Sequence, residues 1–341
     1  AVPWNAYPTA DGWVLICSTN DAQWRRIAQL VDPALAQDAR YAELRDRLSH
    51  REAIDARISA WTRGLPLETV SGLLGAQGIP CGGIVTVAGL AQEPNLALRD
   101  TVREVTDPST GQPVKVTGAF IRLDDARAPS PEIPVSQPVT RITLPPRRPA
   151  PVPPSPGSGP AASALAGLRV VEVGQLTTAP LAARHLASFG ADVIKIEPPE
   201  GESARAWAPL RDGVSHFFVA SNGEKRSLAL DLRDAAGAQR LADLLAEADV
   251  LVENMKPGTL ARLGFDPRRL AQINPRLVYC AISGFGVRSV YEGRPAVDTV
   301  IQAMSGMMDA TRSNDVPLKT GISTADIAGG ETGFLAILAA L

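Results

Sequence analysis

The sequence predicts an α/β protein, with a Rossmann-like parallel-sheet large domain preceded by a small α+β domain. Two observations predict the large domain: its strand candidates are apolar along their length, as in LRVVEV, and amphipathic helices alternate with them. This pattern is typical of a parallel sheet covered on both faces. A third observation separates the domains, because residues 129–162 hold 12 of the 29 prolines. The predicted boundaries are therefore 1–128 for the small domain, 129–162 for a linker and 163–341 for the large domain.

In the small domain a buried strand is expected at 13–17 (WVLIC), after the turn at Asp11-Gly12. Helices are predicted at 21–31, 51–64 and 67–78, and Gly78 is the expected C-cap of the last one. The segments VREVTDP and VKVTGAFIRL predict a hairpin around Ser109-Thr110-Gly111. The proline-rich linker favours a solvated polyproline conformation, and a plain spacer is preferred there over a ligand for an SH3-like domain.

In the large domain, strands are expected at 168–173, 191–197, 226–232, 249–255 and 276–284, with helices at 180–190 and 235–248. A further strand is predicted at 318–323, followed by a helix over GGETGFLAILAAL. Ligands of open parallel sheets bind beyond the carboxyl ends of the strands. The residues to consider for a site are therefore those that follow the strands, at 174–178, 197–199, 254–258 and 283–286.

Composition and charge exclude several classes of function. The net charge of −2 and the scattered arginines give no reason to expect nucleic acid or a membrane surface as partner. No apolar run approaches 18 residues and no leader pattern opens the chain, so we expect a cytoplasmic protein. Cys17, Cys81 and Cys280 are too few and too separated for a disulfide framework, and they are predicted to be buried free thiols.

Neither a nicotinamide nor a metal cofactor is expected. The first strand-to-helix turn, VGQLTTAP, lacks the G-x-G-x-x-G pattern, although Glu197 ends the second strand where a ribose-binding acid would stand. His50, His185 and His216 are far apart, and none has a partner at the spacing of metal ligands. A G-x-S-x-G elbow and a P-loop are also missing from the sequence.

Six segments in a fixed order are more specific than any single motif. They are LRVVEV, AP-x(9)-GADVIKIEPPEG, NGEKRSLALDL, ADVLVENMKPGTLARLGF, NPRLVYCAISGFG and TADIAGGETGFLAILAAL. The series resembles the large domain of the family III CoA-transferases (CaiB/BaiF), a group that contains formyl-CoA transferase and shares its fold with α-methylacyl-CoA racemase. The segments PWNAYPTADGWV, GIPCGGI and DPSTGQPVKVTG resemble the small domain of the same family. The resemblance covers almost everything except the linker.

The order of the domains departs from the family, in which the large domain comes first. A circular permutation and a tandem protein with two modules both explain this order. The tandem reading is favoured because Ala1 is not Met and the last helix has no C-cap, so that the chain is expected to be an excerpt. The family forms interlaced dimers, which implies a homodimer or an intramolecular pseudo-dimer. The two domains are expected to move independently on the linker.

The resemblance implies a CoA-transferase that moves CoA from an acyl-CoA to a carboxylic acid. In the family an aspartate attacks the thioester, which gives a mixed anhydride and then an aspartyl-CoA thioester; the matching residue is Asp326. A helix N-terminus there would favour the ionised, nucleophilic form. Gly329 and Gly330 would leave space for the thioester and free N–H groups for an oxyanion. From the local sequence alone, a helix N-cap is the stronger reading of Asp326.

The family's contacts to coenzyme A match eight residues, three of them after the first strand of the large domain. These residues are Gln175, Leu176, Thr178, Leu230, Arg233, Asn254, Met255 and Arg262. A guanidinium binds phosphate oxygens in a bidentate fashion, so the two arginines suit the phosphates of CoA. A solvated surface charge is the alternative for each arginine.

Two departures from the family bear on the reaction. Thr177 stands where formyl-CoA transferase carries Gln, which disfavours the same oxalate and formate chemistry. Val297, directly before Asp298, stands where the racemases carry the His that transfers a proton. An acyl-CoA racemase or a CoA-dependent lyase of the same fold therefore ranks second. A non-catalytic module that completes the dimer of its partner is the alternative from a different class.

Overall fold

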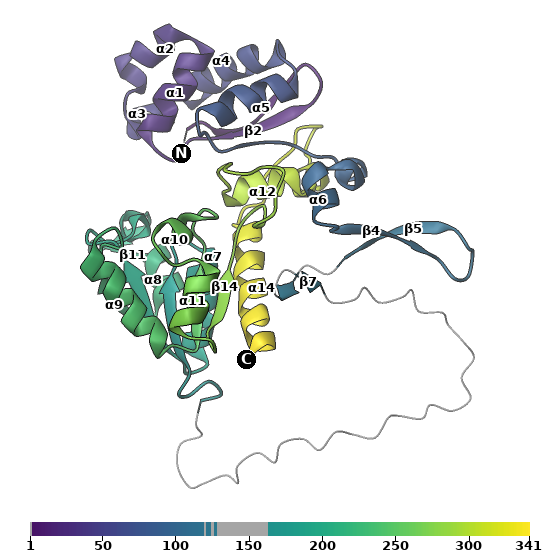
Figure 1. The fold of residues 1–341 in the computed structure, drawn as a ribbon. Helices are drawn as coiled ribbons and strands as arrows, with labels where there is room; N and C mark the ends of the chain where they lie inside the picture. Colours follow the sequence, from purple (N-terminus) through teal and green to yellow (C-terminus); the bar gives the residue numbers. More distant parts are fainter. Residues whose placement is uncertain (1, 119–120, 124–125, 128–162) are drawn as a thin grey trace.

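The computed structural model describes residues 2–118, 121–123, 126–127 and 163–341 (Figure 1). Residues 2–118 are called the N-terminal part below, and residues 163–341 the C-terminal part. The predicted linker at 129–162, with its two boundaries, lies outside the described residues. The division into domains therefore stays a prediction.

The C-terminal part contains a five-stranded sheet in the order β12-β9-β8-β13-β14, and all neighbouring strands are parallel. The strands are β8 (Arg169–Val173), β9 (Asp192–Glu197), β12 (Arg226–Ala229), β13 (Val250–Glu253) and β14 (Val278–Ala281). The parallel Rossmann-like sheet and its five strands are thus confirmed. The first strand, β8, lies between β9 and β13, so the strand order reverses beside it.

Helices cover both faces of this sheet (Figure 1). They are α7 (Thr178–Ser188) and α14 (Thr324–Ala340) on one face, and α9 (Ala235–Ala246), α10 (Thr259–Arg262) and α11 (Pro267–Ile273) on the other. Alternation along each strand explains the two cores, since Val170 and Val193 pack with α7 whereas Val171 and Ile196 pack with α9. No helix in the described parts of the chain is both long and apolar enough to span a membrane.

The strand predicted at 318–323 is wrong, because these residues form a loop before α14. Side chains hold this loop in place of a strand ladder. Thr320 N donates to Gln302 Oε1 over 2.9 Å, and Gln302 Nε2 donates to the carbonyl of Ile322 over 3.3 Å. The remaining short elements of the C-terminal part are η3 (Ser203–Ala206), β10 (Leu210–Arg211), β11 (Val214–Ser215), α8 (His216–Asn222), α12 (Asp298–Met304) and α13 (Met307–Ala310).

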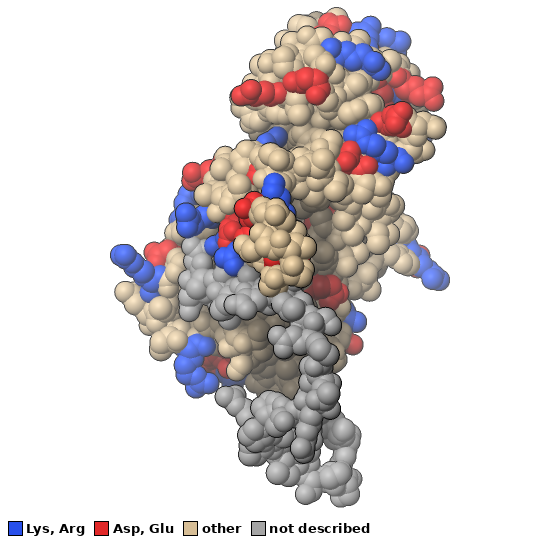
Figure 2. Space-filling view, turned by 90° about the vertical axis from the view of Figure 1, so that its right-hand side faces the viewer, with Lys and Arg blue, Asp and Glu red and all other residues tan. Residues whose placement is uncertain are grey.

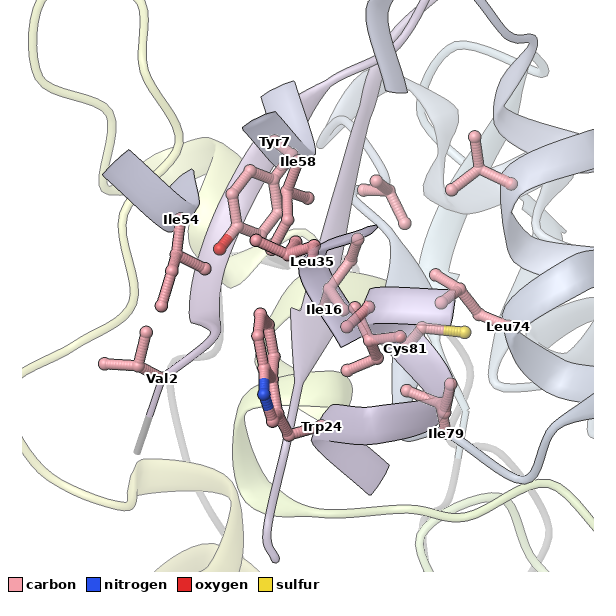
Figure 3. Close-up of a cluster of buried hydrophobic side chains, with 14 of the residues drawn as sticks. Val2, Tyr7, Ile16, Trp24, Leu35, Ile54, Ile58, Leu74, Ile79 and Cys81 are labelled. Atoms are coloured by element: carbon pink, nitrogen blue, oxygen red, sulfur yellow. The ribbon is translucent and has the colours of Figure 1, made fainter. Parts of the chain in front are cut away.

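The N-terminal part is built on an antiparallel sheet of β1 (Trp4–Pro8), β2 (Trp13–Cys17) and β3 (Cys81–Gly83). Its helices are α1 (Asp21–Val31), α2 (Pro33–Gln37), α3 (Leu44–Ser49), α4 (Arg51–Arg63), α5 (Leu67–Ala76) and α6 (Pro94–Leu98), with 3-10 turns η1 (Ala39–Tyr41) and η2 (Ala88–Gln92). Figure 3 shows their apolar side chains converging on Tyr7, Ile16 and Trp24. The three predicted helices are confirmed, but the C-cap of α5 is Gln77 and not Gly78. Gly78 follows it with the positive φ (64°) that is common for a glycine just after a helix.

The predicted hairpin is confirmed as β4 (Val102–Thr106) and β5 (Pro113–Thr117), which extend away from the rest of the chain (Figure 1). Two short strands follow, β6 (Arg122–Leu123) and β7 (Ala126–Arg127). On the N-terminal part, Figure 2 shows acidic and basic side chains intermixed, without a large area of one sign on the visible face of the described residues.

The strand β2 is apolar throughout because both of its faces are buried. Val14 and Ile16 pack on the helices of the N-terminal part, whereas Leu15 and Cys17 share a second core with Val300 of α12. Figure 1 shows α12 between the N-terminal sheet and the parallel sheet. Trp4 Nε1 also donates to Thr299 Oγ1 over 2.9 Å. The expectation that the two domains move independently is therefore wrong, because a shared apolar core joins them.

Candidate active site

Two turns meet at the carboxyl edge of the sheet, where the strand order reverses. One follows β8 at residues 174–178, and the other follows β13 at residues 254–258. The side chain of Asn254 joins them: its Nδ2 donates to the Gln175 carbonyl and to Thr178 Oγ1, and its Oδ1 accepts from Gln175 N, each over 2.8 Å. The structure thus brings together three of the predicted CoA contacts, Gln175, Thr178 and Asn254.

The remaining predicted contacts lie along the same edge. Leu176 is half-buried within the first turn and has a φ of 63°, a conformation that residues with a Cβ rarely adopt. Leu230 and Met255 are partly buried against the core under α9. Arg233 is exposed and pairs with Asp231 over 2.8 Å, while Arg262 Nη2 donates to Thr259 Oγ1 over 2.8 Å. Each arginine therefore has a polar neighbour that a phosphate would have to displace or share.

Asp326 lies in the first turn of α14, as its third residue, and is partly buried. The N-cap position belongs to Ser323, so the reading of Asp326 as an N-cap is wrong. The Thr177 hydroxyl, at the N-cap position of α7, hydrogen-bonds with the Asp326 carboxyl. The residue proposed from the family pattern thus lies beside the first turn after β8, at the carboxyl edge where ligands of such sheets bind.

The side chain of Asp298 occupies the N-terminus of α14. Its Oδ1 accepts from Ala325 N over 2.9 Å and from Asp326 N over 3.2 Å. Its Oδ2 accepts from Gln302 Nε2 over 2.7 Å, and Gln302 is fully buried. A second carboxylate therefore takes the free N–H groups that would otherwise stabilise the charge of Asp326.

This arrangement raises the pKa of Asp326 to about 6, because burial disfavours the charged form and the charge of Asp298 adds to the effect. The Thr177 hydrogen bond acts in the opposite direction but is weaker. We expected the helix N-terminus to lower the pKa of Asp326, and this is wrong, because the pKa is raised. Asp298 accepts the hydrogen bonds at that end of the helix instead. Asp326 is nevertheless mostly ionised at neutral pH.

The glycines after Asp326 serve a purpose that differs from the expected one. A Cβ on Gly330 would lie 2.9 Å from Leu181 Cδ2 and 3.0 Å from the Thr178 carbonyl, and a Cβ on Gly329 would lie 3.2 Å from Thr178 Cγ2. Both residues lie inside α14, where their N–H groups belong to the helix ladder. They allow α14 to approach α7 closely, and the predicted space and free N–H groups for a thioester are not found at them.

Sequence reasoning missed Gln302 and a buried ionic network of Glu172, Lys195 and Lys225, which lies beneath the first turn. The sequence did contain an indication of this network, since RVVEV and DVIKIE each have a charged residue inside an otherwise apolar strand. The three cysteines are free as predicted, but only Cys17 and Cys81 are fully buried, whereas Cys280 is partly buried. Burial raises the pKa of all three thiols. In the described residues, no group of three or more His, Cys, Asp or Glu side chains is arranged to hold a metal ion.

The chain matches the family model described as CoA-transferase family III over residues 1–136 and 165–341. It is 40% identical over 186 residues to the succinate–glutarate CoA-transferase of Agrobacterium fabrum, a match that covers 52% of this chain and 46% of that protein. It is also 40% identical over 182 residues to the formyl-CoA:oxalate CoA-transferase of Streptomyces coelicolor, covering 53% of this chain and 44% of that protein.

A solved structure of a CAIB/BAIF family protein from Brucella suis is similar with a TM-score of 0.51 and 41% identity, over 52% of this chain and 49% of that one. The chain spans about half the length of the curated relatives it matches. The family model, in contrast, accounts for both described parts of the chain on either side of the proline-rich stretch. The chain therefore belongs to CoA-transferase family III.

Proposed function

We propose that this chain is part of an enzyme that moves CoA from an acyl-CoA to a carboxylic acid, with Asp326 as the nucleophile. The observation that carries the proposal is a partly buried carboxyl at the carboxyl edge of the sheet, hydrogen-bonded to Thr177 and adjacent to the turn that Gln175 and Thr178 share. A partly desolvated carboxylate is a stronger nucleophile than one surrounded by water. The named relatives, which are CoA-transferases, support the same class of reaction.

In the proposed reaction the Asp326 carboxylate attacks the thioester carbonyl carbon, the C–S bond breaks and CoA leaves as a thiolate. The thiolate then attacks the Asp326 carbonyl of the mixed anhydride and releases the donor acid, which leaves an aspartyl-CoA thioester. The acceptor carboxylate repeats these two steps in reverse, so that the new acyl-CoA forms and the Asp326 carboxylate returns. No proton is consumed in this exchange.

CoA is proposed to lie across the two turns at the edge of the sheet. Gln175, Leu176, Thr178, Asn254 and Met255 would line its path, with Leu230 beside them, and Arg233 and Arg262 would contact its phosphates. For Arg233 this requires an exchange of its Asp231 partner for phosphate, which is feasible because the pair is exposed and such pairs contribute little stability. The acceptor is proposed to be a small carboxylic acid. Succinate and glutarate, for which a relative of Agrobacterium fabrum is named, are the first to test, because Thr177 disfavours the oxalate and formate reaction.

Trapping of the acyl-enzyme tests the proposal directly. The full-length protein is mixed with an acyl-CoA and hydroxylamine, which cleaves an aspartyl anhydride or thioester to a hydroxamate. Peptide mass spectrometry is expected to locate the hydroxamate at Asp326, and the Asp298→Asn variant serves as a control for the neighbouring acid. A folded protein that binds CoA but carries no adduct at residue 326 would refute the nucleophile.

The pH dependence of this labelling follows from the pKa of about 6. Only the carboxylate attacks, so the rate is expected to be at its plateau above pH 7 and to fall as the pH drops through 6. At pH 5, about one tenth of the carboxyl is ionised and the rate should be about tenfold below the plateau. Initial rates of adduct formation between pH 4.5 and 8, under conditions that keep the protein folded, measure the midpoint. A midpoint near 4, the value of an ordinary Asp, would contradict the role of burial and of Asp298.

A further inference from the structure

The face of the parallel sheet that α7 covers changes from apolar to ionic toward the carboxyl end of the strands. Val170 and Val193 belong to the apolar core, but Glu172 and Lys195, two positions further along β8 and β9, form an ion pair of 2.7 Å with side chains that are 0% and 1% exposed. Lys225, just before β12, pairs with the other oxygen of Glu172 over 2.7 Å and is 2% exposed. Glu202, also buried, lies 3.2 Å from Lys195 on its other side, and the network as a whole lies beneath the turn after β8.

Both lysines also hold backbone carbonyls on either side of that turn. Lys195 Nζ donates to the Gly174 carbonyl over 2.9 Å, and Lys225 Nζ donates to the Pro180 carbonyl over 2.7 Å. Lys225 is anchored in turn by the Ser221 carbonyl (2.8 Å) and by Asn222 Oδ1 (3.0 Å). Buried lysines therefore hydrogen-bond to the backbone at both ends of the turn that contains Thr177 and the proposed CoA contacts.

Stability alone gives little reason for such a network, because replacement of buried ion pairs by well-packed apolar residues is often neutral or stabilising. Apolar side chains, however, offer no N–H group to a carbonyl. The turn needs such support because Leu176 within it has the disfavoured φ of 63°, and strained residues persist only where their surroundings hold them. We therefore expect the network to act by holding the backbone of this turn in its observed conformation.

We propose that Lys225, together with Glu172 and Lys195, is a positioning residue for the proposed reaction. It holds the Pro180 carbonyl and so fixes the start of α7, which keeps the Thr177 hydroxyl against the Asp326 carboxyl. The inference rests on the proposed function, because its consequence is read at Asp326. Lys225 itself has no contact with Asp326 in the structure and acts through the backbone of residues 177–180.

The test compares Lys225→Met with Thr177→Val by the hydroxylamine-trapping rate of the full-length protein, measured as a function of pH. Methionine has a similar length but no donor, so loss of the Pro180 contact is expected to slow adduct formation at pH 7 about tenfold. Because Thr177 lowers the pKa of Asp326, its displacement should also move the midpoint of the acid limb to higher pH. Thr177→Val is expected to show the same shift, and the double variant should shift no further than either single one.

A merely structural role would lower the folded fraction but leave the midpoint of the folded molecules where it is. Lys115→Met, which removes an exposed lysine on β5, is the matched control and should label as the wild type does. If Lys225→Met does not fold, Glu172→Gln/Lys225→Met removes one charge of each sign and takes its place. A wild-type rate and midpoint in either folded variant, or additive shifts in the double variant with Thr177→Val, would overturn the positioning role. A wild-type protein that forms no adduct would instead refute the proposed function.

Discussion

Replacement of Asp326 by Asn is expected to lower CoA transfer at least about 10³-fold, because the amide cannot form the anhydride and no other group takes over a covalent step. CoA binding should change little, since the proposed contacts to CoA lie on the neighbouring turns. Steady-state rates with an acyl-CoA and a dicarboxylate acceptor, together with the dissociation constant for CoA, separate the two effects. Loss of CoA binding in the same proportion as the rate would assign Asp326 to binding and not to chemistry.

The same variant is expected to be more stable than the wild type at neutral pH. The folded state raises the pKa of Asp326 from 3.8 to about 6, so between these values the folded protein binds more protons than the unfolded chain. Below pH 4 the carboxyl is protonated in both states and does not affect the free energy of unfolding. Between pH 4 and 6 it lowers the free energy of unfolding progressively, and above pH 6 this loss stays constant. Removal of the charge should raise the melting temperature at pH 7.5, and this gain should disappear near pH 4. An equal gain in melting temperature at pH 7.5 and at pH 4 would show that the folded state does not disfavour the charge of Asp326.

Asp298→Asn is the matched control for both readouts. The amide oxygen can still accept from Ala325 N, so this hydrogen bond to the first turn of α14 is retained while the negative charge is removed. Adduct formation should persist, and its acid limb should move to lower pH because one cause of the raised pKa of Asp326 is gone. A loss of labelling as complete as that of Asp326→Asn would mean that the chemistry requires Asp298 itself.

The strands and most helices were predictable because their signals are local. WVLIC and LRVVEV are short apolar runs flanked by turn residues, and a run such as AAGAQRLADLLAEA has the helical period, so each element is defined by its own residues. The loop at 318–323 failed for the converse reason. Its β-branched residues favour a strand locally, but hydrogen bonds from Gln302, 18 residues away from Thr320, hold it as a loop.

The position of Asp326 came from the family pattern, while its electrostatics depended on contacts that sequence reasoning does not reveal. Asp298 lies 28 residues before Asp326, and only the packing of α12 against α14 brings its carboxylate to the helix end. The second face of β2 is a similar case: WVLIC predicts burial on both sides but does not say that α12 provides one of them. Long-range partners were therefore the missing part of both the fold and the site.

Gly330→Val is expected to lower the rate of CoA transfer about 10²-fold, because a misplacement of catalytic groups on the order of 1 Å has an effect of that size. The added Cβ would lie 2.9 Å from Leu181 Cδ2 and 3.0 Å from the backbone carbonyl of Thr178, which has little freedom to move. Valine's two methyl groups add to this conflict, so α14 must move away from α7. That movement separates Asp326 on one helix from Thr177 at the start of the other. Stability should fall by about 1–3 kcal/mol, the usual cost of overpacking.

Gly72→Val in α5 is the matched control, since it places the same side chain at an exposed position of a helix, where nothing lies within 4 Å of the added Cβ. It should leave the rate of CoA transfer unchanged. For Gly330→Val, the hydroxylamine-trapping rate at pH 7 and the midpoint of its acid limb are measured alongside thermal unfolding. Because separation from Thr177 removes the hydrogen bond that lowers the pKa of Asp326, the midpoint should move to higher pH. A folded Gly330→Val protein with the wild-type rate and midpoint would show that the close approach of α7 and α14 serves packing alone.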